Sequence, residues 1–302
     1  MTRWVGHVAG LALAAGVTIA AGAALADQPA PGAIDFQVSA SPIMTEIRWF
    51  HHAILMPIIT VVTLFVLGLL AICIVRFNAR ANPTPSKTTH NVAIEVLWTI
   101  VPIIILIVIA IPSFQLLYRQ QTVPPADLTV KVTGTTWAWT YAYPDHGNFE
   151  FRSNMLSDDA PGLSDDQRRA GVAARTQAAQ QLGRPIEQMP RLLAVDNEMV
   201  VPVGRIVRVQ VTAAEVMHSF AMPAFGVKID AIPGRLNEGW FRAERPGIYY
   251  GQCSELCGRD HAFMPIAIRV VSEQDFAAWV EDARRRFAAD PAPSPVTVAT
   301  AR

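Results

Sequence analysis

Two long stretches of the chain contain apolar residues and no charged one. Residues 53–75 form the first stretch, and residues 96–117 form the second. A transmembrane helix needs ~20 such residues, because the hydrocarbon core of a bilayer is about 30 Å thick. Pro57, Pro102 and Pro112 fall within these stretches, and membrane bundles tolerate proline better than soluble helices do. The pattern therefore predicts two transmembrane helices; a buried helix of a soluble core is the alternative.

The segment between the two helices, residues 76–95, is basic. Its charged residues are Arg76, Arg80 and Lys87, followed by a single acid, Glu95, at the start of the second helix. Because positive residues concentrate on the cytoplasmic side of a membrane, this segment is predicted to be a cytoplasmic loop. Residues 27–52 and everything after the second helix are then periplasmic.

The N-terminus has the pattern of a secretory signal peptide over residues 1–26. Arg3 is followed by a small apolar stretch, and residues 24–26 form an Ala-Leu-Ala cleavage pattern. The alternative is an uncleaved first membrane helix. We expect the mature chain to begin near Asp27.

From residue 128 onward, apolar and polar residues alternate in short runs. Strict alternation indicates strands that are buried on one face. The predicted strands are residues 128–133, 137–143, 200–203, 206–212, 239–242, 248–251 and 265–271. Many short strands separated by Gly and Pro turns predict a β-sandwich or small barrel over residues 128–271. In the second strand the alternation puts Trp137, Trp139, Tyr141 and Tyr143 on one face, so some of these rings belong to the core.

Two segments depart from the β pattern. Residues 157–191 are rich in Ala, Gln, Asp and Arg, which predicts a surface insertion with a polar helix over 165–182. Ser272 with Asp275 forms a capping box, which predicts a helix over residues 272–287. The Pro- and Ala-rich residues 288–302 are predicted to be a disordered tail.

Composition narrows the classes of protein. The 302 residues include 25 basic and 25 acidic ones, charged residues make up 17%, and the mean hydropathy is +0.27. A chain of this kind is not a disordered polyelectrolyte. Its zero net charge argues against nucleic acid as a partner. Three cysteines are too few for a disulfide scaffold.

The stretch from residue 251 to 264 gathers soft ligands. Cys253, Cys257, His261 and Met264 fall within twelve residues, and His218 lies 35 residues upstream, at the end of an alternating strand. Thiolate, thioether and imidazole donors together favour copper, whereas a zinc site more often lacks Met. A mononuclear blue-copper site uses one thiolate, so the second thiolate suggests two bridged metals.

Simpler explanations remain for several of these residues. Cys253 and Cys257 could form a disulfide in an oxidising compartment, although the three neighbouring ligands disfavour this. The other candidates have structural explanations: packing in the first helix for Cys73, an interfacial position before that helix for His51 and His52, and a solvated loop for His90.

With these motifs, the sequence resembles subunit II of bacterial haem–copper cytochrome c oxidases. The stretch from Cys253 to Met264 resembles the binuclear copper motif of that family, called CuA. Residues 215–220, 222–225 and 134–141 resemble its upstream ligand region and its aromatic segment. The resemblance implies a two-helix transmembrane hairpin followed by an all-β cupredoxin-like (Greek-key) domain.

The resemblance also implies roles for individual residues. Cys253 and Cys257 would bridge both coppers, and His218 and His261 would each bind one. The remaining copper ligands would be the Met264 thioether and the Glu255 carbonyl. The Glu255 carboxylate would reach a magnesium ion at the interface with subunit I, since magnesium prefers oxygen ligands.

Trp137 and Glu95 have competing explanations. Trp137 matches the position where electrons enter in the family, whereas a core aromatic on a strand is the plain alternative. Glu95 matches the mouth of a proton path into subunit I, whereas snorkelling at the membrane edge explains it equally simply.

Two acids, Asp196 and Glu215, match positions that help dock cytochrome c in the family. Glu215 replaces the usual Asp, and Ala142 stands where relatives often carry another acid. The docking surface is therefore weaker, shifted, or supplied by the insertion at 157–191.

The implied function is electron transfer in respiration. The chain would accept electrons from cytochrome c at a binuclear copper centre and pass them to haem in subunit I. Subunit I would reduce O2 to water and pump protons, in the bacterial inner membrane with other oxidase subunits. Three alternatives stay open: a quinol oxidase subunit II, whose branch lacks these copper ligands, a membrane-anchored copper carrier, and a structural domain with a disulfide.

Overall fold

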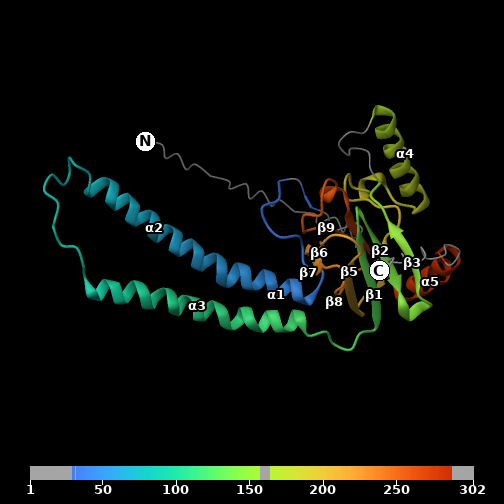
Figure 1. Cartoon of the computed structure of the whole chain (residues 1–302), viewed down its shortest axis with the longest axis horizontal. Coiled ribbons are helices and arrows are strands. Elements are labelled where there is room, and N and C mark those ends of the chain that lie inside the picture. Colours follow the sequence, from blue (N-terminus) through green and yellow to red (C-terminus); the bar gives the residue numbers. More distant parts are fainter. Residues whose placement is uncertain (1–28, 31, 157–163, 288–302) are drawn as a thin grey trace, which may run out of the picture.

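The computed structural model describes residues 29–30, 32–156 and 164–287. In it, two long helices project from one side of a β-domain (Figure 1). The predicted signal peptide (1–26) and tail (288–302) lie outside the described residues, as do residues 157–163 of the insertion.

The first membrane helix begins earlier than predicted. It consists of α1 (Pro42–Phe50), the π-helical turn η1 (His51–Leu55) and α2 (Met56–Arg76), which together form one run of 35 residues. The Ser41 hydroxyl accepts a hydrogen bond from the Met44 N–H at 3.1 Å, and proline follows at the first helical position. His51 and His52 therefore lie within the helix, and the prediction that they precede it is wrong.

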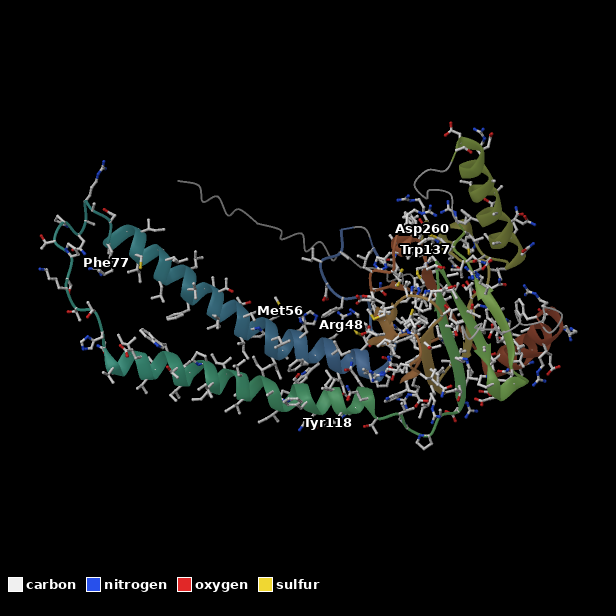
Figure 2. All side chains as sticks on the ribbon, in the orientation of Figure 1. Arg48, Met56, Phe77, Tyr118, Trp137 and Asp260 are labelled. Carbon is white, nitrogen blue, oxygen red and sulfur yellow. The ribbon has the colours of Figure 1, made fainter. Side chains whose placement is uncertain are left out.

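The second membrane helix, α3, runs from Val92 to Gln121 and exceeds the predicted span at both ends. The Asn91 side chain caps it by accepting hydrogen bonds from the N–H groups of Ala93 and Ile94. Glu95 accordingly lies in the first helical turn rather than in the loop. Figure 2 shows side chains projecting from both helices along their length, with Met56 on the first, Phe77 directly after its end, and Tyr118 on the second.

The β-domain consists of two five-stranded sheets. The first has the order β3 (Phe149–Ser153), β2 (Ala138–Tyr143), β1 (Leu128–Thr135), β5 (Ile206–Ala213), β8 (Asn237–Arg242). The second has the order β4 (Met199–Pro202), β10 (Pro265–Val271), β9 (Gly247–Cys253), β6 (His218–Met222), β7 (Val227–Ala231). This arrangement confirms the predicted class, two apolar helices followed by a β-domain of the cupredoxin-like kind.

The core of the domain follows from the alternation that the sequence displays. Val130 and Val132 on β1 are fully buried. They pair with Val209 and Val211 of the parallel neighbouring strand β5, which are also fully buried. Trp139, Tyr141 and Tyr143 join this core from β2, whereas Trp137 lies outside the strand and is only partly buried.

Three strands, β3, β6 and β7, were not predicted. The sequence of β6, His-Ser-Phe-Ala-Met, is buried at four of its five positions, so it has no polar face and no alternation. β3 and β7 do alternate over five residues each, so the sequence pattern was present and could have revealed them.

The remaining helices border the sheets. α4 (Asp165–Gln181) and α5 (Glu273–Phe287) agree closely with the predicted helices. The Ser272 hydroxyl accepts a hydrogen bond from the Asp275 N–H and donates one to its carboxylate, which is the expected cap. The short 3-10 turns are η2 (Pro144–His146), η3 (Ile186–Gln188), η4 (Pro223–Phe225) and η5 (His261–Phe263).

Both membrane helices are tied to the β-domain where they meet it. Ala40 accepts a backbone hydrogen bond from Glu244 and donates one to Ala224, each at 2.9 Å. On the second helix, the Trp240 indole donates to the Arg119 carbonyl at 3.1 Å. These contacts fix the domain relative to the helices and therefore relative to the membrane.

Candidate metal centre

Strand pairing brings the distant histidine to the cysteine loop. β6 and β9 are antiparallel neighbours, with Phe220 opposite Cys253. His218 is the first residue of β6, so it lies beside the end of β9, where Cys253 begins the loop. The sequence predicted His218 at the end of an alternating strand; it lies at the end of a strand, β6, but that strand does not alternate.

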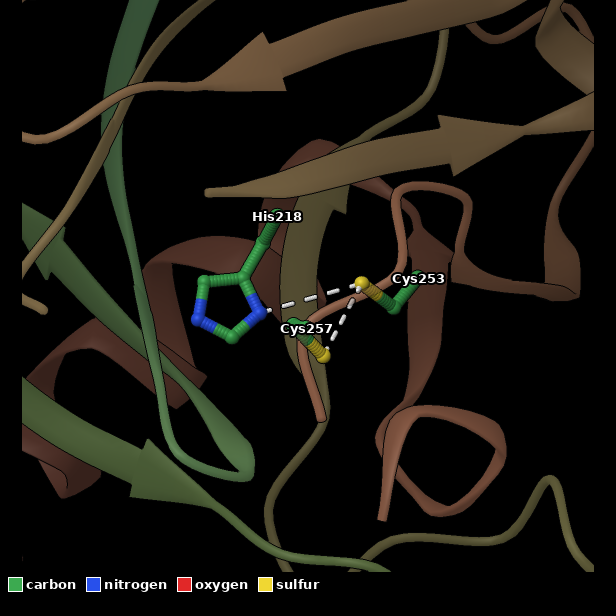
Figure 3. Close-up of side chains that lie close together, drawn as sticks. All are labelled: His218, Cys253 and Cys257. Atoms are coloured by element: carbon green, nitrogen blue, oxygen red, sulfur yellow. Dashed lines mark hydrogen bonds between the residues drawn. The ribbon is translucent and has the colours of Figure 1, made fainter. Parts of the chain in front are cut away.

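Figure 3 shows the side chains of His218, Cys253 and Cys257 converging, and His261 and Met264 lie against the same sulfur atoms. The sulfur atoms of Cys253 and Cys257 lie 3.9 Å apart. The His218 Nδ1 is 3.8 Å from the Cys253 sulfur, and the His261 Nδ1 is 3.6 Å from the Cys257 sulfur. The Met264 thioether is 3.5 Å from the Cys257 sulfur. Each thiol therefore has its own imidazole.

The Glu255 carbonyl completes the set of donors. It lies 3.4 Å from the Cys253 sulfur, whereas the Met264 thioether contacts the Cys257 sulfur. The Glu255 side chain is exposed. One residue therefore offers a main-chain oxygen to the cluster and a carboxylate to its surroundings.

Most of the cluster is buried. Cys253, Cys257, Met264 and His218 are buried, and His218 has no exposed surface, whereas His261 is partly exposed. Burial, with Cys253 next to it, raises the pKa of the Cys257 thiol to about 12, and burial lowers the pKa of His218. Two thiolates in such a site need a bound cation, and soft sulfur with imidazole nitrogen fits copper. Burial also disfavours rapid metal exchange, which a copper carrier needs.

Two residues that the sequence did not single out hold His218 in place. A Cβ at Gly134 would lie 2.7 Å from the His218 ring, so only glycine lets the ring lie against β1. The Trp139 ring meets His218 edge-on with centroids 5.8 Å apart, and its Nε1–H donates to the Met264 carbonyl at 3.1 Å. Trp139 therefore supports two ligands at once.

Trp137 lies against the ligand loop. Its Nε1–H donates to the Cys257 carbonyl at 3.1 Å. A Cβ at Gly258 would lie 3.2 Å from the indole, so the glycine allows the loop backbone to approach the ring. Trp137 is only partly buried, so a purely structural role in the core fits it less well than it fits the fully buried Trp139.

The other predicted site residues lie outside the cluster of donor atoms. The Glu215 carboxylate accepts a hydrogen bond from the Thr136 N–H at 3.3 Å, beside Trp137. Asp196 accepts hydrogen bonds from Asn154 at 2.7 and 3.0 Å. Glu95 is at the end of α3 remote from the β-domain (Figure 1). Ala142 is buried, so its position adds nothing to the surface.

Fold and site together define a class, the membrane-anchored proteins in which two helices carry a β-domain with a candidate site for a soft metal. Residues 29–116 match the family described as cytochrome C oxidase subunit II, transmembrane domain. Residues 180–271 match cytochrome C oxidase subunit II, periplasmic domain. The chain belongs to the cytochrome c oxidase subunit II family.

Individual relatives agree with the family match. Cytochrome c oxidase subunit 2 of Cereibacter sphaeroides is 48% identical over 283 residues, which cover 91% of each protein. Probable cytochrome c oxidase subunit 2 of Rickettsia bellii is 49% identical over 255 residues, 84% of this chain and 86% of the relative. The crystal structure of the periplasmic domain of subunit II of cytochrome oxidase (CoxB) of Bradyrhizobium japonicum is 57% identical. The match covers 55% of this chain and 99% of the chain in that crystal structure, with a TM-score of 0.44.

Membership confirms the family to which the sequence was assigned by resemblance. The chain is a subunit of a cytochrome c oxidase, an oxidoreductase complex, and other oxidase subunits are its partners. It is a two-pass membrane protein with a periplasmic C-terminal domain. The His/Cys/Cys cluster is its candidate copper site.

Proposed function

We propose that this chain is the electron-accepting subunit of a respiratory oxidase in the bacterial inner membrane. It takes single electrons from cytochrome c at a binuclear copper A centre and passes them to haem in subunit I. Reduction of O2 to water and proton pumping take place in that partner.

One observation carries the proposal, namely the paired arrangement of donors. Two thiol sulfurs 3.9 Å apart, each with an imidazole Nδ1 within 3.6–3.8 Å, suit two metals that share both thiolates. Bound there, a pair of copper ions supplies a one-electron carrier. The thioether of Met264 and the carbonyl of Glu255 lie on opposite sulfurs, so each metal has a further weak donor.

The chain's own residues favour fast transfer by keeping the site rigid. Gly134 and Trp139 fix the His218 ring, so the donors need not rearrange when the charge of the site changes. Burial excludes water, whose reorganisation slows electron transfer. Electrons enter through Trp137, and its contact from the surface to the Cys257 carbonyl supports this role.

Three further roles follow from the family resemblance. Glu255 holds a magnesium ion at the interface with subunit I through its exposed carboxylate. Glu95 marks the mouth of a proton path at the cytoplasmic end of α3. Asp196 and Glu215 help to dock cytochrome c, which mainly affects the association rate.

Copper stoichiometry and EPR of the full chain test the proposal. We expect a mixed-valence signal in which one unpaired electron is shared between two copper nuclei. Cys257→Ser should abolish this signal because it removes a shared sulfur. Cys73→Ser is the matched control, since Cys73 lies on α2 away from the site, and it should leave the signal unchanged.

A signal from a single isolated copper in the wild-type chain would contradict the binuclear assignment. Thiol titration of the metal-free chain tests the disulfide alternative. If Cys253 and Cys257 are free thiols that copper protects from the reagent, the disulfide is excluded. If neither thiol reacts, the domain is structural instead.

A further inference from the structure

The exposed face of Trp137 is covered by a charged side chain. The guanidinium carbon of Arg259 lies over the Trp137 ring, 5.4 Å from its centroid, which is within the range of a cation–π contact. Asp260 holds the guanidinium in place by two contacts, 3.1 Å from Nε and 2.9 Å from Nη2. Figure 2 places Trp137 and Asp260 together at one end of the β-domain.

The rest of the indole is already engaged by the same loop. The Cys257 carbonyl accepts its N–H, and Gly258 packs against the ring. The Arg259 side chain is 80% exposed, so it remains at the surface although it is paired with Asp260. A redox partner that approaches the ring therefore meets the guanidinium.

We propose that Arg259 is a specificity-determining residue that selects electron donors by the charge of the surface they bring to Trp137. By offsetting one of two neighbouring carboxylates, it weakens the preference of this surface for a donor whose contact face is strongly basic. The proposal rests on the proposed function, in which electrons enter through Trp137.

The charges around the ring support this. Two carboxylates lie near Trp137: Asp260, paired with Arg259, and Glu215, bound to the Thr136 N–H. Without Arg259 the patch would be purely acidic and would attract a basic donor. With it, the three side chains sum to a net charge of −1 instead of −2, and the buried Ala142 adds no acid. Charge at an exposed contact acts chiefly on the rate of association.

Two small reductants of opposite charge test the proposal without any docking surface of their own. The copper-loaded full chain is reduced in a stopped-flow instrument by hexaammineruthenium(II), a dication, or by iron(II)–EDTA, a dianion. Each molecule gives one electron to the copper site and is itself oxidised by one electron. For Arg259→Gln at low ionic strength, we expect the cation to react faster and the anion more slowly, each by about three- to tenfold. The effect should shrink in high salt.

Three further variants separate charge from structure. Arg259→Lys keeps the charge and should preserve the wild-type ratio of the two rates. Asp260→Asn removes a negative charge and should move the ratio in the opposite direction. Arg285→Gln is the matched control, because Arg285 is 72% exposed and paired with Asp282 on α5, away from the site; it should change neither rate.

The outcomes distinguish this inference from the proposed function. An unchanged ratio in Arg259→Gln, or a change of both rates in the same direction, overturns the role of Arg259 while the copper spectrum stays intact. Absence of a binuclear copper spectrum in the wild-type chain overturns the proposed function and this inference with it.

Discussion

Two tryptophans, two residues apart, support different parts of the ligand loop. Trp137 donates its indole hydrogen bond to Cys257, and Trp139 donates its own to Met264. Trp139 is fully buried, whereas Trp137 reaches the surface. Trp137 is therefore accessible to a partner at the surface, whereas Trp139 is positioned to support the geometry of the candidate site.

Trp139→Phe should alter the copper EPR spectrum. Phenylalanine keeps an aromatic ring near His218 but leaves the buried Met264 carbonyl without its donor, at a cost of about 1–3 kcal/mol. Trp279→Phe is the control: Trp279 packs on Tyr143 and Phe149, and it should lose stability without a spectral change. Identical spectra for the wild type and Trp139→Phe would refute the positioning role.

Trp137→Gln should slow the transfer of electrons from cytochrome c by about tenfold or more, equivalent to ~1.4 kcal/mol of barrier. Glutamine can still donate to the Cys257 carbonyl, so copper content and spectrum should stay as in the wild type. Stopped-flow reduction by cytochrome c measures the rate. Trp49→Gln, at an exposed position of α1, is the control. A wild-type rate in Trp137→Gln would exclude this route.

At the scale of elements, the segment that carries α4 is anchored by a buried charge network. Arg184 makes a bidentate pair with Glu198, with both contacts at 2.7 Å, and Arg269 of β10 joins the same carboxylate at 3.1 Å. The side chains of Arg184 and Glu198 are almost completely buried. A loss of one partner would leave buried charge uncompensated, which is far more costly than breaking a surface pair.

Glu198→Gln should lower the free energy of unfolding by about 3 kcal/mol and make the α4 segment more sensitive to protease. Glu281→Gln breaks an exposed pair with Arg284 on α5 and should cost less than about 1 kcal/mol. Chemical denaturation and limited proteolysis measure both. Equal losses in the two variants would show that the network does not anchor the segment.

At the scale of the whole molecule, one metal site joins segments of the second sheet to the loop between its strands. Cys257 and His261 belong to the loop after β9, while His218 belongs to β6. A ligand that binds only the folded chain adds to its stability. Copper should therefore stabilise the β-domain as well as carry electrons.

Removal of copper should lower the melting temperature of the full chain. At a free copper concentration 100 times the dissociation constant, bound copper stabilises the fold by about 2.7 kcal/mol. Calorimetry before and after chelation measures the shift. Cys257→Ser provides the control, since copper should no longer raise its melting temperature; an equal rise in both chains would mean that copper acts elsewhere.

Properties that depend on local chemistry were determined by the sequence alone. Uncharged runs of residues located both membrane helices, alternation located most strands, and the spacing from Cys253 to Met264 singled out candidate ligands for a soft metal. The Ser41–Pro42 cap was also present in the sequence, and using it would have corrected the start of the first helix. Each of these signals acts within a few residues, so no knowledge of the fold is needed to recognise it.

Contacts between distant segments were decided only by the tertiary structure. The pairing of β6 with β9 brought His218 to the thiols, and β6 has no alternation by which the sequence could reveal it. The packing of Gly134 against His218 and of Arg259 over Trp137 likewise joins residues that are far apart in the chain. Such contacts depend on how the two sheets and the ligand loop pack together, and short-range patterns contain no record of that packing.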